Sequence, residues 1–204
     1  MRISVAACGA LVAGLMYASP ARAIPIADPG TEGLKVIVTG TDPIIATYQG
    51  NTATFTNLLY LMLIGSGQPG DDGDPANDLF IFNNQASPVG STFDLGSFPI
   101  GTELEFRLFV TNTGNNFFSG PASRNPDDTA HARVQNGWQS GTTLVSFEDL
   151  LNGPFNYNDL SFSFTNTSAS VGDPTVPEPA SLMLLGTGLL GLTTIRRRMN
   201  SVVQ

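Results

Sequence analysis

The strongest constraint on the fold is a strict alternation of apolar and polar side chains in two stretches of the chain. Residues 103–110 read ELEFRLFV and residues 160–166 read LSFSFTN. A period of two gives an extended strand one apolar and one polar face, whereas an amphipathic helix repeats every 3.6 residues. The pattern therefore predicts two half-buried strands, whose inward side chains are Leu104, Phe106, Leu108, Val110, Leu160, Phe162 and Phe164.

Other parts of the chain have the composition of short strands separated by turns. With 22 Gly, 14 Pro and only 13% charged residues, the chain lacks the runs of Ala, Leu, Glu and Lys that long helices need. Apolar and β-branched segments between turn clusters predict further strands at 34–40, 52–65, 78–84, 91–96, 131–137 and 142–147. Within the second of these, residues 58–64 fit either a buried strand or a short helix.

This pattern predicts an all-β domain over residues 24–168, built as an antiparallel, jelly-roll-like sandwich of two sheets. The following residues, 169–176, are rich in Ser, Gly and Pro and are expected to form a flexible linker.

The first 23 residues have the layout of a secretory signal peptide. Arg2 precedes an apolar run, expected to be helical, and the small residues Ala21 and Ala23 mark a cleavage site for signal peptidase after Ala23. A lipoprotein signal ending at Cys8 is the alternative, but it leaves an apolar segment shorter than the usual ~7–15 residues. Cleavage after Ala23 leaves a mature chain without cysteine, and so without disulfides or a thiol nucleophile.

Charge is distributed unevenly along the chain. Between residues 24 and 180 there are four basic and seventeen acidic residues, so this part carries 4 − 17 = −13. Such a surface repels nucleic acid and attracts cations.

The end of the chain has an apolar segment followed by a basic cluster. Residues 180–195 are uncharged and would span about 24 Å as a helix at ~1.5 Å per residue, a short match to a ~30 Å bilayer core. Arg196, Arg197 and Arg198 would then stay on the cytoplasmic side. The GTGLLG sequence inside this segment matches G-x-G-x-x-G, but no strand precedes it and no acidic residue follows it, so a dinucleotide site is excluded.

Immediately before that segment stand Pro177, Glu178 and Pro179. This order of Pro-Glu-Pro, short apolar helix and Arg cluster resembles the PEP-CTERM sorting signal of exported bacterial proteins. The resemblance covers residues 176–198 and implies processing by an exosortase-type membrane enzyme that cuts near Pro-Glu-Pro. The protein would pass through an inner-membrane-tethered intermediate and then reach the cell surface or the extracellular, biofilm-associated matrix. A permanent C-terminal membrane anchor is the alternative.

The sequence offers little catalytic chemistry in its central part. His131 is the chain's one histidine, and the stretch has no G-x-S-x-G, no H-E-x-x-H and no Cys/His cluster. A hydrogen-bonding role at a strand end is therefore favoured for His131, and we expect the protein not to be an enzyme.

Acidic residues gather instead at the two ends of a predicted hairpin, in the sequence VSFEDLLNGPFNYNDLSFSF. Glu148 and Asp149 end one strand, and Asn158 and Asp159 begin the next. Ca²⁺ takes six to eight oxygen ligands from carboxylates, amides and carbonyls, so this hairpin is a candidate calcium site. On the residues alone, a solvated hairpin loop with Asx turns remains the alternative.

The same stretch resembles a bacterial domain-of-unknown-function family with an F-E-D-L … D-Y-N-D signature, found in surface, adhesin-like and PEP-CTERM proteins. The resemblance runs from about residue 101 to 167 and implies an all-β domain, no known catalysis and Ca²⁺ binding through the motif acids. Glu148, Asp149, Asn158 and Asp159 match the signature. Asn156 stands where the family has Asp, and Gly-Pro-Phe replaces its Gly-Gly-Asp, which implies weak binding.

A second acidic loop, GDDGDPAND, is a weaker candidate metal site through Asp72, Asp74 and Asp78, because it lacks the sixth-position Gly and final Glu of an EF-hand. The sequence thus favours a structural or matrix-interaction role with Ca²⁺. The alternative is a carbohydrate-binding module for exopolysaccharide that stacks sugars on an exposed Trp138 or Tyr157; a hydrolase with two carboxylates at glycosidase spacing is least favoured.

Overall fold

The computed structural model describes residues 23–139 and 141–170, which form twelve antiparallel β-strands in three sheets and no α-helix. In sheet order, the largest sheet consists of β5 (Thr92–Asp94), β2 (Ile45–Gly50), β11 (Leu160–Phe164), β10 (Thr142–Phe147) and β9 (Ala132–Trp138). The second consists of β4 (Leu79–Asn83), β3 (Asn57–Leu61), β7 (Phe106–Val110) and β8 (Asn115–Phe118). The smallest consists of β12 (Thr167–Ser170), β1 (Lys35–Val38) and β6 (Glu103–Leu104), and a 3₁₀ turn, η1, spans Ala122–Arg124.

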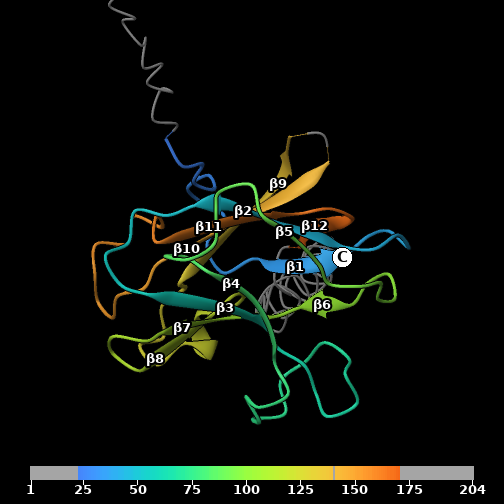
Figure 1. Cartoon of the computed structure of the whole chain (residues 1–204), viewed down its shortest axis with the longest axis horizontal. Helices are drawn as coiled ribbons and strands as arrows, with labels where there is room; N and C mark the ends of the chain where they lie inside the picture. The colour runs from blue at the N-terminus through green and yellow to red at the C-terminus, as the bar shows by residue number, and fades with distance from the viewer. Residues whose placement is uncertain (1–22, 140, 171–204) are drawn as a thin grey trace, which may run out of the picture.

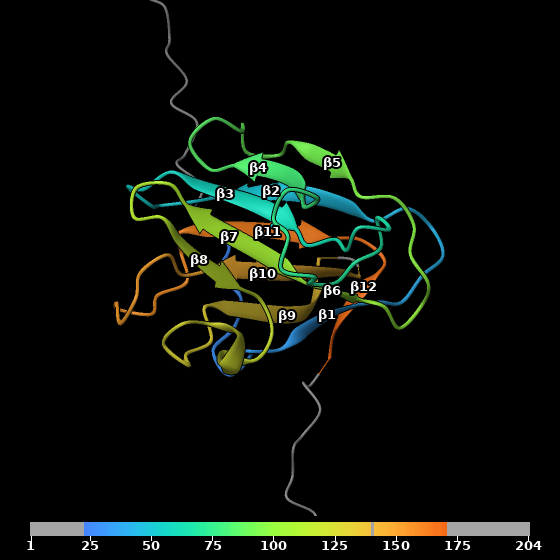
Figure 2. The same ribbon diagram turned by 90° about the horizontal axis from the view of Figure 1, so that it is seen from below.

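The two larger sheets are the layers of a sandwich. Figure 1 shows the sheet of β2, β11 and β10 above the sheet of β3, β7 and β8, and Figure 2 shows the four-stranded sheet lying across the five-stranded one. The small sheet of β1 and β6 closes one end between the layers (Figure 1). The expected all-β antiparallel fold is confirmed, but the expectation of two sheets was wrong by one.

The third sheet arises because the chain crosses from one sheet to another at two points, each between two consecutive strands. β6 and β7 are separated by a single residue, Glu105, where the chain leaves one sheet and enters another. Likewise, β11 and β12 are separated by Thr165 and Asn166, and Asn166 adopts a positive φ of 56°. A sandwich corner of this kind depends on local backbone bends, which the period-two pattern does not contain.

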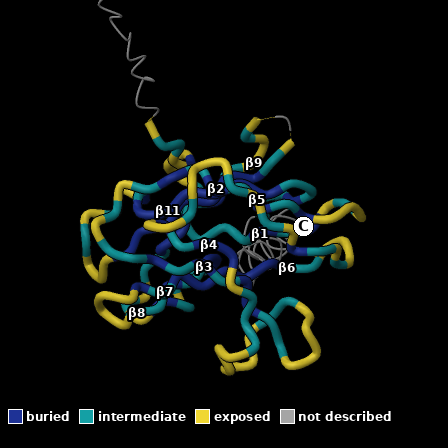
Figure 3. The backbone as a smooth tube through the Cα atoms, viewed as in Figure 1, coloured by how far each residue is buried: buried dark blue, intermediate teal, exposed yellow. Residues whose placement is uncertain are grey.

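The core lies between the layers and is made of the predicted inward side chains. Leu104, Phe106, Leu108, Val110, Leu160, Phe162 and Phe164 are all 0% exposed. Phe106 joins the two layers, because its ring stacks on Phe164 at 4.5 Å between centroids and lies 6.2 Å from Phe162. Each buried phenylalanine contributes about 1.5–3 kcal/mol from lost apolar surface. Figure 3 shows the buried backbone concentrated in the facing strands and the exposed backbone in the loops.

The polar faces of the two alternating strands are more covered than the pattern implies. Arg107 is 8% exposed because the loop before β4 places Asp78 against its guanidinium. Ser161 is fully buried and lies 3.0 Å, oxygen to oxygen, from Ser146, whose hydroxyl accepts a hydrogen bond from the backbone N–H of Ala27. The segment before β1 therefore covers the outer face of the larger sheet.

Some strand boundaries differ from the sequence prediction. The ambiguous run within 52–65 is strand, but β3 covers only Asn57–Leu61. Strands β2, β8 and β12 were not expected. Of the linker predicted over 169–176, Ala169 and Ser170 belong to β12, and residues 171–176 lie outside the described residues. The Asn136 side chain accepts a hydrogen bond from Ala169 N at 2.6 Å and donates one to Ala169 O at 3.2 Å.

The expected signal helix and the expected transmembrane helix of the tail fall outside the described residues. Within 23–139 and 141–170, no helix is long and apolar enough to cross a membrane.

Candidate metal centre

The candidate centre lies at one end of the β10–β11 hairpin. The two strands pair from Thr143 with Phe164 to Phe147 with Leu160, so residues 148 and 159 follow directly on the last pair. The Asp159 N–H donates to the Phe147 carbonyl at 3.1 Å, and the Glu148 N–H donates to the His131 carbonyl at 2.9 Å. The sheet hydrogen bonds therefore hold the acidic ends of both strands side by side, as the sequence predicts.

Three carboxylates meet at this point. Glu148, Asp149 and Asp159 each offer one oxygen, and these three oxygens all lie within 4.8 Å of one another. The three residues are only 1%, 3% and 9% exposed. The backbone N–H of Asp149 donates to Asp159 Oδ2 at 3.0 Å, and the N–H of Asn156 donates to Glu148 Oε2 at 3.0 Å. The loop thus folds back over its own carboxylates.

A fourth side chain reaches the cluster from the opposite layer. Asn57, at the start of β3, is fully buried and donates from Nδ2 to Asp149 Oδ2 at 2.8 Å. Its Oδ1 is buried and has no hydrogen-bond partner among the described residues. The sequence analysis did not identify Asn57, although one signal was present. Asn57 lies on the same inward face of the strand as Leu59 and Leu61, and a buried polar residue there requires a hydrogen-bond partner.

Burial raises the pKa of each acid in the cluster. The pKa of Asp149 rises from its ordinary 3.8 to about 6, first because of desolvation and then because of the charge on Asp159, and against the hydrogen bond from Asn57. Desolvation likewise raises the pKa of Asp159 to about 6, with the Glu148 charge adding to it. Desolvation also raises the pKa of Glu148. The site is therefore costly to keep fully ionised without a counter-charge.

The described residues supply no Lys or Arg as that counter-charge, because each of their four basic side chains is paired elsewhere. Arg107 pairs with Asp78, Arg133 with Glu32, and Lys35 and Arg124 with Glu103. Buried charges in proteins are normally paired, hydrogen-bonded to a proton donor or bound to a metal. Neither a Lys nor an Arg of the described residues therefore balances the charge of the cluster, which protons or a cation from solution could do.

His131 lies at a strand end, and both of its ring nitrogens have hydrogen-bond partners. It precedes β9, is fully buried and stacks on Phe117 with ring centroids 3.9 Å apart. Its Nδ1 lies 3.1 Å from the Glu148 carbonyl oxygen, and its Nε2 lies 3.1 Å from Asp127 Oδ2. Nδ1 thus contacts the strand end that carries the acids, and Nε2 contacts the loop before β9.

The two asparagines predicted as ligands are placed differently. Asn156 Oδ1 accepts from the Asn158 N–H at 3.3 Å, which is an Asx-type turn. The Asn158 carbonyl accepts from Thr52. Within the described part of the chain, no hydrogen bond links either side-chain amide to the three carboxylates. Asn156 supports the centre through its backbone N–H instead.

The acidic residues of the second loop do not lie close enough together to share a metal ion. Among the described residues, Asp72, Asp74 and Asp78 do not form a cluster of potential metal ligands. Asp72 accepts hydrogen bonds from Gly65 N, Asp74 N and Asn77 Nδ2, which shape the loop. Asp78 is committed to Arg107, with 2.7 Å between Oδ2 and Nη2.

The aromatic residues considered for sugar stacking are also placed differently. Tyr157 is 4% exposed, its hydroxyl donates to the Ala130 carbonyl at 2.8 Å, and the Arg133 guanidinium covers its ring at 4.2 Å. Tyr157 is therefore not an exposed platform. Trp138 is partly buried at the end of β9, away from the hairpin loop.

Comparison with known proteins identifies one feature of the chain. Residues 175–198 match the PEP-CTERM protein-sorting motif. That motif implies exosortase-dependent export and attachment to the membrane, cell surface or matrix. It lies outside the described residues, and it includes the Pro177-Glu178-Pro179 and Arg196–Arg198 elements noted in the sequence. No curated protein matches the chain. No solved structure matches it either.

Proposed function

We propose that the protein is a non-catalytic structural or interaction component of the cell surface or extracellular matrix, whose β-sandwich is stabilised by Ca²⁺ at the β10–β11 hairpin. The observation that carries this proposal is the buried cluster of Glu148, Asp149 and Asp159, which has no Lys or Arg partner in the described part of the chain. The sorting motif supports a site of action outside the cytoplasm.

The donor set suits calcium better than other common ions. All the side chains that meet here offer oxygen, which is the ligand atom of hard cations, and no cysteine or histidine nitrogen takes part. The buried Oδ1 of Asn57 is a further oxygen without a partner. Ca²⁺ accepts irregular shells of six to eight oxygens, whereas Mg²⁺ demands octahedral geometry and dehydrates reluctantly. We therefore expect Ca²⁺ to bind and Mg²⁺ to bind less well.

The burial of the cluster argues against the hydrolase alternative. A glycosidase needs its two carboxylates on either side of a substrate bond, in a cleft that a sugar chain can enter. Glu148 and Asp149 are 1% and 3% exposed and are covered by the loop that carries them. A cation can reach such a place during a small opening of the loop, but a polysaccharide cannot.

Titration calorimetry of the purified full chain with CaCl₂ tests the proposal directly. We expect one site with a Kd on the order of 10⁻⁴–10⁻³ M, the range of extracellular modules. Asp159→Asn should abolish the binding heat. Asp94→Asn is the matched control, because Asp94 is an exposed acid whose Oδ1 accepts from Gly96 N, a bond that asparagine preserves. Absence of binding by the wild type, or equal binding by wild type and Asp159→Asn, would contradict the proposal.

A further inference from the structure

A second feature lies on the outer face of the four-stranded sheet, away from the acidic cluster. A pocket of about 540 Å³ is formed there between the sheet and the loop that precedes β4. This volume is within the range of small-molecule sites. None of the residues that line it belongs to the acidic cluster.

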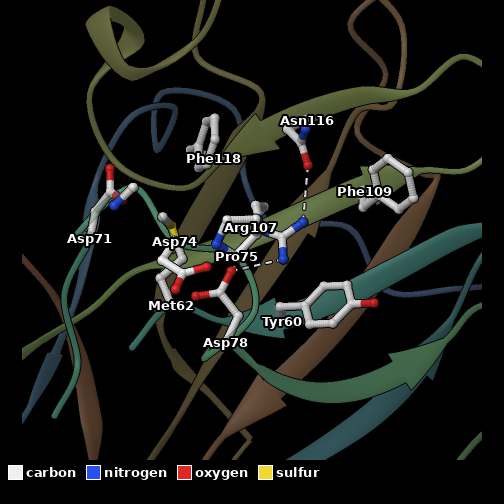
Figure 4. Close-up of a pocket in the computed structure, with 11 residues that line it drawn as sticks. Tyr60, Met62, Asp71, Asp74, Pro75, Asp78, Arg107, Phe109, Asn116 and Phe118 are labelled. Atoms are coloured by element: carbon white, nitrogen blue, oxygen red, sulfur yellow. Dashed lines mark hydrogen bonds and ion pairs between the residues drawn. The ribbon is translucent and has the colours of Figure 1, made fainter. Parts of the chain in front are cut away.

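Side chains on the outer face of β3, β7 and β8 form one wall and the floor of the pocket. Tyr60 on β3, Arg107 on β7 and Phe118 on β8 are consecutive cross-strand partners, so their side chains share one face. Phe109 and Asn116 form the next pair along the same face. Figure 4 shows Arg107 at the centre, with the rings of Tyr60, Phe109 and Phe118 around it.

The floor is rigid and nearly neutral. Arg107 Nε and Nη2 contact Asp78 Oδ2 at 2.8 and 2.7 Å, and Nη1 donates to Asn116 Oδ1 at 3.0 Å (Figure 4). The side chains of Arg107 and Asp78 are only 9% and 3% exposed. The guanidinium also lies 4.3 Å from the centre of the Tyr60 ring. Binding groups held this firmly lose little conformational entropy when a ligand arrives.

Several polar atoms at the pocket remain unused. Among the described residues, no hydrogen bond involves Asn116 Nδ2 or the Tyr60 hydroxyl, and two of the five guanidinium N–H groups of Arg107 have no acceptor. Asp71 and Asp74 each use one oxygen to accept a backbone N–H of their own loop. The pocket thus presents donors and acceptors side by side between aromatic rings.

These groups select for one class of ligand. Three acids against one arginine disfavour phosphate and other anions. One face of Tyr60, on which an ammonium ligand could sit, is taken by the protein's own Arg107. A purely apolar ligand would leave the polar floor unpaired. A sugar ring has both an apolar C–H face for the aromatic rings and hydroxyls that donate and accept.

We propose that this pocket binds a neutral sugar residue, stacked on Phe109 or Phe118 and hydrogen-bonded to the Arg107–Asp78–Asn116 floor. The inference goes beyond the calcium-supported structural role and does not depend on it. It moves carbohydrate recognition from Trp138 and Tyr157, where the sequence suggested it, to the outer face of β3, β7 and β8.

The test is saturation-transfer NMR on the purified full chain with four probes, namely maltose, cellobiose, lactose and N,N′-diacetylchitobiose. Choline and inorganic phosphate serve as a cationic and an anionic comparison. We expect at least one disaccharide to bind in the millimolar range, and Phe109→Ala to weaken it about tenfold, equivalent to about 1.4 kcal/mol. Phe118→Ala provides a second wall variant should Phe109→Ala fail to fold.

Trp138→Ala is the matched aromatic control, because Trp138 does not line the pocket. It should bind the sugar as the wild type does. The proposal is overturned if no disaccharide binds, if choline or phosphate binds in a Phe109-dependent manner instead, or if Trp138→Ala removes binding while both phenylalanine variants retain it. The calcium proposal would be unaffected by any of these results.

Discussion

Without a bound cation, the acidic cluster should make the stability of the domain fall as the pH rises. In the folded chain the pKa of Asp149 is raised from 3.8 to about 6 by burial, so the folded state holds this proton more tightly than the unfolded state. The stabilising effect of the proton is complete below pH 3.8 and is lost as the pH rises through about 6. At about 1.4 kcal/mol per pKa unit, the difference is about 3 kcal/mol.

Asp159 has a pKa raised to about 6 as well, but it interacts directly with the other two acids. Because the three groups titrate together, the effect of one carboxyl is the appropriate scale for the cluster. For a domain of this size, about 3 kcal/mol corresponds to a fall of about 6–12 °C in Tm, at about 2–4 °C per kcal/mol.

Calcium should remove most of this pH dependence. A ligand that binds only the folded state at a hundredfold excess over its Kd contributes about 2.7 kcal/mol to stability. This is close to the stability of about 3 kcal/mol that ionisation of the cluster removes. Because protons and Ca²⁺ compete for the same oxygens, the calcium effect should be large at about pH 7.5 and small at about pH 4.5. The assay is thermal unfolding of the full chain by circular dichroism, in chelator and in CaCl₂, at both pH values.

Two variants make the result specific. Asp159→Asn removes one ionised group, so at neutral pH in chelator it should melt at or above the wild-type temperature and should not respond to calcium. Asp94→Asn should behave as the wild type. A calcium effect that is equal at the two pH values, or greater in acid, would refute the reasoning that the cation replaces protons on the cluster.

Two further predictions concern other parts of the chain. Burial raises the pKa of Glu105 from 4.5 to about 7 despite the nearby Arg124. Glu105→Gln should therefore stabilise the domain by up to about 3 kcal/mol above pH 7 and have no such effect near pH 4.5. Lower Tm values for the variant at both pH values would mean that the attraction to Arg124 outweighs desolvation. Replacing Pro177, Glu178 and Pro179 by Ala should leave export intact and prevent removal of the tail, seen as a larger, membrane-retained protein in cell fractions; unchanged size and release would exclude an exosortase-type cut at this motif.

Local pattern was sufficient to predict the inward face of the central strands. Leu104, Phe106 and Leu108 are buried as the period-two alternation requires, because that alternation follows from backbone geometry alone. It was not sufficient for β8, Asn115–Phe118, which begins with two asparagines and reads locally as a turn. This segment is a strand because β7 offers it an edge to pair with, and strand propensity depends strongly on such context.

The candidate metal centre was predictable to the extent that it is local. Glu148 and Asp159 are brought together by the hairpin they close, so their proximity follows from the strand pairing of β10 and β11. Asn57 is 92 residues from its partner Asp149 and belongs to the other layer. Its arrival at the site depends on how the two sheets pack, and a single sequence contains no direct signal for that.

Strand β3 shows how one short strand serves both proposed sites. Its residues alternate between the two faces, so Asn57, Leu59 and Leu61 point into the sandwich while Tyr60 lies on the outer face with Arg107. The inward Asn57 contacts the acidic cluster, and the outward Tyr60 lines the pocket. Because a shift of one residue in the register of β3 would exchange these faces, it would bury Tyr60 and expose Asn57 at once. The buried Leu59 and Leu61, both 0% exposed, oppose that shift and thereby hold both sites in place.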